Sequence, residues 1–227
     1  GAPPAAPAPP APPAPPAPPV PDDWASHGAD STWNVSTTSD DVTLKISAKG
    51  KVEFADDDTD VTSLSDGGSI VIEQRKGRLL SREVRRFEAR ERNGAIERKY
   101  VIDGRDVGEA EGRAWLAGFL PGILREMAVG AERRVARQLA AGGPARVLDE
   151  TAKVKSAFAQ SRYLRQLYRQ VRLDAPMLDR SLRFAGTSLE SDFELGQVLK
   201  TAAERQPVEA ALDAFIEAAR TIESDFE

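Results

Sequence analysis

The chain has 227 residues, of which 41% are hydrophobic, a formal net charge of −5, one histidine and no cysteine. The acidic balance disfavours general nucleic-acid binding, which depends on basic surface that neutralises phosphates. The lack of cysteine excludes disulfides, thiolate nucleophiles and cysteine zinc sites, and no apolar run approaches the roughly 20 residues that a transmembrane helix needs.

The first segment is rich in proline. Residues 2–21 hold 12 of the 16 prolines and little else but alanine, so they lack backbone donors and pack no core. We interpret residues 1–31 as a disordered Pro/Ala-rich tether. Its residues 2–21 form a stalk of about 60 Å at roughly 3.1 Å per residue, with a plain interdomain spacer as the alternative. His27 adjoins it, and we expect a solvated loop residue there rather than a catalytic or metal-binding one.

Residues 32–108 are predicted to form an antiparallel β domain. Alternating hydrophobic residues in 42–46, 52–54 and 70–72 predict half-buried strands. Turn signals separate these runs at Lys49-Gly50, Asp66-Gly67-Gly68, Lys76-Gly77, Asn93-Gly94 and Asp103-Gly104. The clearest hairpin joins 82–92 to 95–102, because Asn-Gly accepts the positive φ angles of a type I′ turn. We expect a β-meander.

Two charged groups stand out in this domain. Alternate positions place one set of arginines on the face opposite Phe87 and Ala89, and this set comprises Arg82, Arg86, Arg90 and Arg92. We expect these arginines to be solvated, with an anion or partner surface as the alternative. The acidic residues 56–60 offer oxygen ligands for calcium, but their spacing matches no EF-hand, so a charged turn is the preferred interpretation.

Residues 109–227 are predicted to be helical. Helical spacing joins Trp115, Leu116, Phe119, Leu120, Ile123, Leu124 and Met127, and we expect this first helix to cover the sheet. Pro121 interrupts the pattern and is expected to kink the helix. Gly142-Gly143-Pro144 then predicts a helix stop followed by a helix start.

The helical part repeats itself. Leu189 to Glu194 recurs as Ile222 to Glu227, 33 residues later, and Ser161-Arg162-Tyr163 is interpreted as a degenerate earlier copy. Pro144, Pro176 and Pro207 recur at similar intervals, which predicts units of two helices. Periods of this length are typical of α-solenoids, with an irregular helical bundle as the alternative. We expect the chain to be an internal fragment, truncated at the start of a further repeat.

This frame predicts particular caps and core residues. Ser191 is expected to cap a helix and Glu194 to close a capping box. The predicted core positions are Phe193, Leu195, Val198, Leu199, Leu212, Phe215 and Ile216. A packed Phe193 implies a loss of roughly 3–5 kcal/mol on substitution by alanine.

A basic stripe provides the candidate partner-binding residues. Arg162, Arg165, Arg169 and Arg172 fall within about 80° of arc on a helix, and no acidic residue interrupts residues 161–172. Such a field steers an anionic partner, although a solvated helix face is the ordinary alternative.

Several motifs together resemble a known bacterial arrangement. They are the segment 52–61, the strand 70–74, residues 98–104, Trp115-Leu116 and the Ser-Asp-Phe-Glu repeats. They resemble the C-terminal extracytoplasmic region of BlaR/MecR-type membrane metallopeptidase antirepressors and related membrane-anchored regulators. The zinc peptidase motif of those proteins is absent, so no catalytic residue carries over. The resemblance implies a periplasmic location, tethered to the inner membrane through a region outside this chain.

The sequence therefore predicts an α+β protein, in which an antiparallel β-meander precedes an α-helical hairpin repeat array. The leading functional hypothesis is a non-catalytic sensor or protein-interaction module, with no cofactor or metal, that binds a protein partner or an anionic envelope component. Alternatives are a structural spacer of the cell envelope and a carboxylate-dependent hydrolase, which needs two acids across a cleft.

Overall fold

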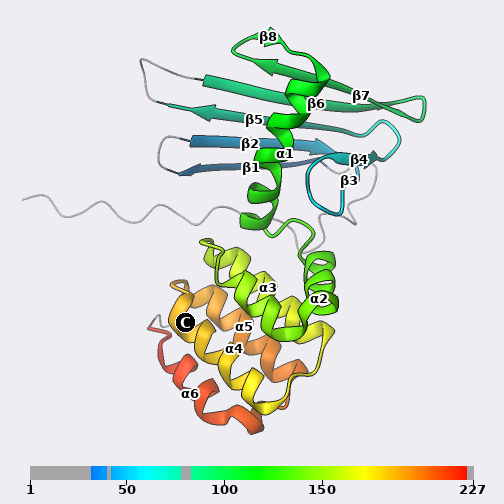
Figure 1. Ribbon diagram of the computed structural model, residues 1–227. Coiled ribbons are helices and arrows are strands. Elements are labelled where there is room, and N and C mark those ends of the chain that lie inside the picture. The colour runs from blue at the N-terminus through cyan, green and yellow to red at the C-terminus, as the bar shows by residue number, and fades with distance from the viewer. Residues whose placement is uncertain (1–31, 40–41, 78–82, 224–227) are drawn as a thin grey trace, which may run out of the picture.

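A computed structural model describes residues 32–39, 42–77 and 83–223. Within them the protein is α+β, as predicted: one helix crosses an antiparallel sheet, and the remaining helices form a second body below it (Figure 1). The predicted tether with His27, and Arg82 of the predicted hairpin, lie outside the described residues.

The strands form two sheets. They are β1 (Thr32–Ser39), β2 (Val42–Lys49), β3 (Val52–Phe54), β4 (Val61–Leu64), β5 (Ser69–Lys76), β6 (Glu83–Arg92), β7 (Ala95–Ile102) and β8 (Arg105–Asp106). Six pair antiparallel in the order β1-β2-β5-β6-β7-β8, and β3 pairs only with β4. The expected simple meander is thus wrong at one point, because the chain leaves the large sheet after β2, forms the β3–β4 ribbon and returns as β5.

The predicted hairpin is present. Asn93 and Gly94 join β6 to β7 with φ angles of 54° and 78°, which suit a type I′ turn. Phe87 and Ala89 of β6 are buried, whereas Arg90 and Arg92 on the opposite face are exposed. The alternation in the sequence therefore identified both faces of this strand.

A row of hydrophobic side chains crosses the sheet. Ile46 pairs with Ile72, Ile72 with Phe87 and Phe87 with Tyr100, so four neighbouring strands place these buried side chains side by side. The Phe87 and Tyr100 ring centroids lie 5.1 Å apart. This row is the floor on which the first helix packs.

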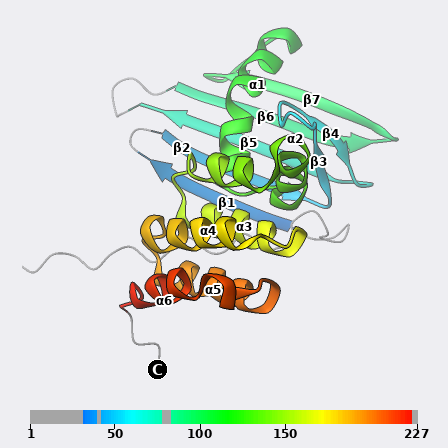
Figure 2. The same ribbon diagram turned by 60° about the horizontal axis from the view of Figure 1, so that its bottom comes forward.

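Helix α1 (Glu109–Glu126) covers that row, as predicted (Figures 1 and 2). Its buried stripe of Leu116, Leu120 and Leu124 joins the core of the sheet, and the helix continues through Pro121. At Gly112 the helix lies so close to the sheet that an added Cβ would be 2.1 Å from Cγ of Tyr100. The sheet core extends to Val129, so the two hydrophobic cores divide after α1.

The other helices build the second core. They are α2 (Ala131–Thr151), α3 (Ala157–Gln170), α4 (Ala175–Ser188), α5 (Asp192–Arg205), a 3₁₀ helix (Val208–Ala211) and α6 (Leu212–Arg220). Non-helical backbone at Gly142 and Gly143 confirms the predicted break inside α2. Helix α3 packs against α2 and α5, and α4 packs against α6 (Figures 1 and 2). No helix in the described ranges is long and apolar enough to cross a membrane.

The helix caps agree with the predicted repeat at one serine and differ from it at another. Ser191 caps α5, accepting a hydrogen bond from the Glu194 backbone N–H at 3.4 Å, as predicted. The earlier copy was assigned wrongly, because Ser156 rather than Ser161 caps α3, accepting from the Ala159 N–H at 3.3 Å. Ser161 is buried inside α3.

The predicted helical core is correct only in part. The inner positions of α5 are buried, namely Leu195, Val198 and Leu199. Three other predicted core residues are exposed instead: Phe193 at 58%, Leu212 at 51% and Ile216 at 37%. They lie on the side of the last two helices that no described element covers, which the repeat pattern alone did not reveal.

Phe193 is therefore expected to contribute little to stability in this chain, contrary to the estimate from the repeat. We expect Phe193→Ala to lower the free energy of unfolding by less than about 1 kcal/mol, and Leu195→Ala, on the same helix but 1% exposed, to lower it by about 2–5 kcal/mol. Urea denaturation of both variants measures this difference. Equal losses would contradict the observed packing of α5.

The three tyrosines, Tyr100, Tyr163 and Tyr168, are all buried. Burial disfavours the phenolate and raises the pKa of each above its ordinary value. We expect less phenolate absorbance near pH 10 in the folded protein than in the unfolded chain. Because the unfolded chain releases these protons near pH 10 and the folded chain retains them, stability falls as pH rises beyond that value. Equal tyrosine ionisation at pH 10 in the folded protein and in the unfolded chain, with the circular dichroism of the folded protein unchanged, would contradict the packing.

Candidate functional site

The predicted arginine stripe does not form one exposed surface. Arg162 is only 5% exposed and Arg165 is half-buried, and both have interaction partners within the chain. Arg169 and Arg172 are exposed, but α3 ends at Gln170, before Arg172. The expectation of a solvated stripe is wrong for Arg162 because α5 packs on that side of α3. A partner-binding role for the four arginines stays a prediction.

The acidic residues 56–60 connect β3 to β4. The Asp57 carboxylate accepts hydrogen bonds from the Thr59 hydroxyl at 2.7 Å and its backbone N–H at 3.1 Å, which lowers the pKa of Asp57. Asp58 and Asp60 instead make ion pairs with arginines from other elements. No group of acidic or histidine side chains in the described ranges is arranged to hold a metal ion. Through these ion pairs the loop contacts β7, α1 and α2.

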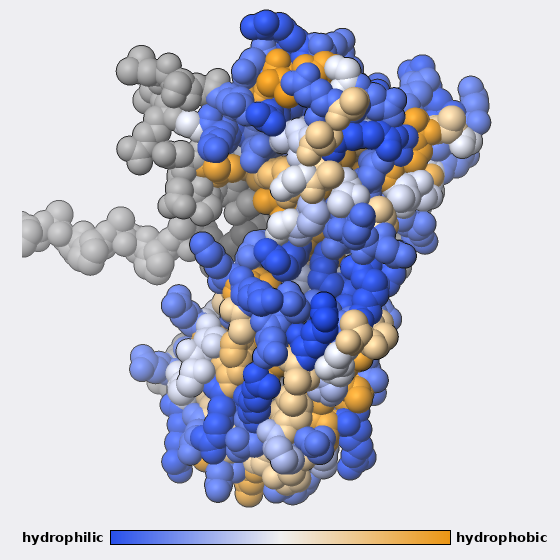
Figure 3. All heavy atoms as spheres, viewed as in Figure 1, coloured by the Kyte–Doolittle hydropathy of each residue, from blue (hydrophilic) through white to orange (hydrophobic). Residues whose placement is uncertain are grey.

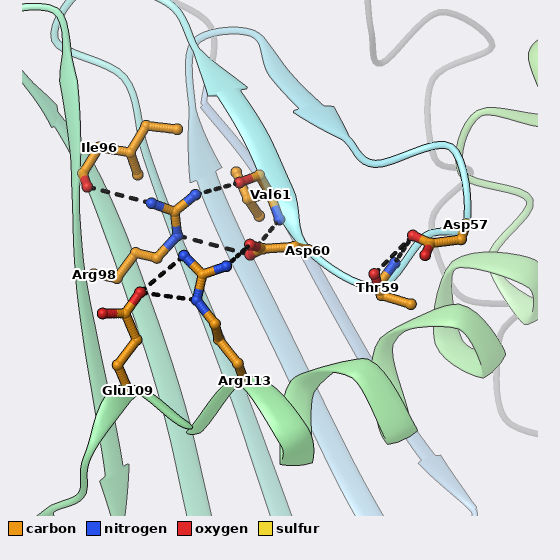
Figure 4. Close-up of polar contacts among 8 residues, drawn as sticks. All are labelled: Asp57, Thr59, Asp60, Val61, Ile96, Arg98, Glu109 and Arg113. Carbon is orange, nitrogen blue, oxygen red and sulfur yellow. Dashed lines mark hydrogen bonds and ion pairs between the residues drawn. The ribbon is translucent and has the colours of Figure 1, made fainter. Parts of the chain in front are cut away.

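At one side of the loop, Asp60 joins the sheet to α1 (Figure 4). Its carboxylate lies 3.7 Å from Nε of Arg98 on β7 and 3.2 Å from Nη1 of Arg113 on α1. Arg98 also donates to the Val61 carbonyl at 2.7 Å, and Glu109 pairs with Arg113 at 2.8 Å. The nearby charge raises the pKa of Arg113, with Asp60 as the main cause.

A pocket of about 330 Å³ adjoins this cluster. It is lined by Ile96, Arg98, Lys99, Tyr100, Asp106, Val107 and Glu109. Lys99 pairs with Asp106 at 3.2 Å, so two basic and two acidic side chains leave the lining without excess charge. The pocket therefore has no electrostatic preference for an anion or a cation.

At the other side of the loop, Asp58 joins the ribbon to the helices. It forms an ion pair with Arg134 of α2, a side chain that is 8% exposed. Arg134 also donates to the Val129 carbonyl at 2.8 Å and to the Tyr163 hydroxyl at 2.9 Å. That hydroxyl in turn donates to the Arg125 carbonyl at 2.8 Å. This network contacts the β3–β4 loop, the end of α1, α2 and α3.

Beside the network lies a groove of about 310 Å³, here called the arginine groove. Its lining consists of Asp58, Pro121, Arg125, Arg134, Arg137, Gln138, Ala141, Arg146 and Glu150. Four arginines thus face two carboxylates. Figure 3 shows hydrophilic surface in this region, at the waist between the sheet and the lower helices.

The charges of the groove are only partly balanced. Asp58 forms an ion pair with Arg134, and its carboxylate lies 3.8 Å from the guanidinium of Arg137. Glu150 forms an ion pair with Lys153 at 2.7 Å. Arg125 and Arg146 form no ion pair with any residue in the described ranges, and the buried Nε of Arg125 has no hydrogen-bond partner there. Guanidinium groups match carboxylate and phosphate oxygens, so this groove suits an anionic group.

The arginine groove was not predicted from the sequence. Its residues come from α1, from both halves of α2 and from the β3–β4 loop, so they are scattered along the chain. The basic run at Arg133, Arg134 and Arg137 was the available local signal. The ion pair between Arg134 and Asp58, which lie 76 residues apart, cannot be predicted from the local sequence pattern.

Comparison with protein-family models, curated proteins and solved structures finds no match to this chain. Functional inference therefore depends on the geometry of the groove and on the sequence resemblance described above.

The buried ion pair generates a stability prediction. We expect Asp58→Ala to lower the free energy of unfolding by about 3 kcal/mol, because it leaves the Arg134 charge buried without its partner. Asp56→Ala is the matched control in the same loop. Its carboxylate is exposed and 3.6 Å from Arg137, so the expected loss is below about 0.5 kcal/mol. Equal effects in urea denaturation would contradict the structural role of Asp58.

Proposed function

We propose that this chain is a non-catalytic protein-interaction module, and that the arginine groove binds an acidic segment of a protein partner. In this proposal the module is the extracytoplasmic sensor part of a membrane-anchored bacterial regulator. The observation that carries the binding claim is the uncompensated charge of Arg125 and Arg146 where the sheet and helices meet.

The position of the groove supports a sensing role. Arg125 belongs to α1, which packs on the sheet, whereas Arg146 belongs to α2, which packs in the helical core. An anionic segment that contacts both guanidinium groups bridges the two cores. Binding there would stabilise one relative placement of the sheet and the helices, which gives the bound state a structural consequence.

We further propose that the helices are an α-solenoid-like array of two-helix units. The support is the packing of α3 beside α5 and of α4 beside α6, together with serine caps at Ser156 and Ser191. Buried residues recur at 33-residue spacing: Leu178, Ser181 and Ala185 of α4 are followed by Ala211, the last residue of the 3₁₀ helix, and by Ala214 and Ala218 of α6. These pairs indicate one packing pattern used twice.

The proposed periplasmic location and inner-membrane tether depend on the resemblance to BlaR/MecR-type antirepressors. The Pro/Ala-rich residues 2–21 are compatible with a stalk of that kind. A structural spacer of the cell envelope remains the second candidate. The two functions differ in one measurable respect, because only an interaction module requires saturable binding at a defined surface.

The binding claim is tested by the fluorescence anisotropy of a labelled oligoglutamate peptide. We expect saturable binding that weakens at high salt. Arg146→Glu is expected to raise Kd at least about tenfold, equivalent to about 1.4 kcal/mol. Arg169→Glu is the matched control, since Arg169 is also exposed but lies on α3 outside the groove, and it should leave Kd within about twofold.

Other outcomes reassign the surface or remove it. A loss confined to Arg169→Glu would move the site to the predicted stripe on α3. Saturable binding to phosphatidylglycerol vesicles but not to the peptide would favour an anionic envelope component. Failure of the unaltered chain to bind either probe would contradict an anion-binding groove and favour the spacer.

A further inference from the structure

One face of the large sheet is not covered by any described element. Helix α1 packs on the other face, over the buried row that includes Ile72 and Phe87 (Figures 1 and 2). Successive side chains of a strand point to opposite faces, so the residues between those buried positions form the uncovered one. We call this surface the outer face. Its charged residues are seven cations, Lys45, Lys49, Arg75, Arg86, Arg90, Arg92 and Lys99, and four acids, Glu73, Glu88, Glu97 and Asp106.

The outer face has an excess of positive charge, although the whole chain has a net charge of −5. Its central acids also lie deeper than its arginines. Glu73 forms ion pairs with Arg75 and Arg86, and Glu88 with Arg86 and Arg90. The side chains of Glu73 and Glu88 are only 13% and 20% exposed, whereas those of Arg86 and Arg90 are 41% and 59% exposed. A molecule that approaches this face therefore meets guanidinium groups first.

Two lysines extend the positive surface onto β2. Lys45 and Lys49 are exposed and form no ion pair with any residue in the described ranges. Ser47 lies between them on the same strand, and its hydroxyl donates to the side chain of Asn34 on β1 at 2.5 Å. Small hydroxyl and amide groups thus lie beside uncompensated ammonium groups.

The composition of the outer face selects among anionic partners. None of its described side chains is aromatic, so it has no surface on which nucleic-acid bases stack. The large hydrophobic side chains that the described residues expose are Phe193, Leu212 and Ile216 of the helical body, so none of them inserts into a bilayer from this face. Adjacent strands of a sheet also twist by roughly 20–25°, so the face meets a planar membrane over a small area.

The backbone of the sheet disfavours a peptide on this face. Strands β2, β5 and β6 are paired on both sides, so they present only side chains to a partner. Extended peptides bind sheets through main-chain hydrogen bonds at a free edge. A polysaccharide needs no such bonds, because its hydroxyl and carboxylate groups bond to side chains. Guanidinium and ammonium groups match its carboxylates.

We propose that the outer face binds an acidic polysaccharide, a linear chain of uronic acid units. The carboxylates pair with cations that include Lys45, Lys49 and Arg90, and the sugar hydroxyls bond to Ser47 and its neighbours. This surface is separate from the arginine groove, whose residues come from α1, α2 and the β3–β4 loop. The inference therefore does not depend on the proposed binding of an acidic protein segment.

The test measures the fluorescence anisotropy of a labelled oligogalacturonate, with labelled neutral dextran as the uncharged probe. We expect saturable binding of the oligogalacturonate that weakens at high salt, and no binding of dextran. The face variant combines Lys45→Gln, Lys49→Gln and Arg90→Gln. It is expected to raise Kd for the oligogalacturonate at least about tenfold.

Two further variants separate local charge from net charge and from folding. Arg172→Gln, Lys200→Gln and Arg205→Gln together remove the same charge from exposed positions of the helical body, and they should change Kd less than about threefold. A charge-retaining variant with Lys45→Arg, Lys49→Arg and Arg90→Lys should also stay within about threefold. Circular dichroism checks that each variant is folded. If the face variant does not fold, Lys49→Gln alone, at the end of β2, is expected to raise Kd about threefold.

Several results would overturn the proposal. Failure of the unaltered chain to bind the oligogalacturonate would remove the site, and equal losses in the face variant and the helical-body variant would reduce it to net charge. A loss caused by Arg146→Glu instead would place the polysaccharide in the arginine groove. Tighter binding to duplex DNA or to phosphatidylglycerol vesicles would assign the outer face to a different partner. Oligoglutamate binding at the groove is measured separately, so failure of either claim is distinguishable from failure of the other.

Discussion

The buried ion pair between Arg134 and Asp58 determines how the two bodies of this protein meet. A guanidinium group keeps its charge at any ordinary pH, so its burial requires a carboxylate and further acceptors. Asp58 supplies the charge, and the Val129 carbonyl and Tyr163 hydroxyl supply the remaining oxygens. These groups come from the ribbon, the α1–α2 turn and α3, so a single side chain constrains all three.

The α1–α2 turn shows the consequence of that constraint. Ala128 and Gly130 both have positive φ angles, of 53° and 67°, and Ala128 is a residue type that rarely adopts this backbone. Arg134 bonds to the carbonyl of Val129, between them. Nearby, Glu126 at the end of α1 accepts the backbone N–H groups of Lys155 and Ser156 at 3.0 and 3.2 Å, just before α3. The turn thus joins two cores through specific polar contacts, and the proposed binding groove lies beside them.

Features set by contacts between neighbouring residues were predictable from the sequence, whereas features set by contacts between distant elements were not. Hairpin turns and the alternating faces of β6 were predictable because their signals are local. The burial of Arg162 was not, since it depends on where α5 packs. The exposure of Phe193 and Ile216 depends likewise on an element that covers or fails to cover them.

Ser156 and Ser161 lie five residues apart, and only the hydrogen bond to Ala159 distinguishes the true cap from the buried serine. The candidate site was missed because its arginines converge from separate helices.

The most direct test of this account is a double-mutant cycle on the free energy of unfolding, with Asp58→Ala and Arg134→Met made singly and together. Methionine keeps much of the apolar length of Arg134 without its charge. We expect a coupling energy of at least about 1.5 kcal/mol, because the two residues stabilise the junction as a pair. A coupling energy below about 0.5 kcal/mol would contradict it and leave the junction of sheet and helices to apolar packing and the other polar contacts.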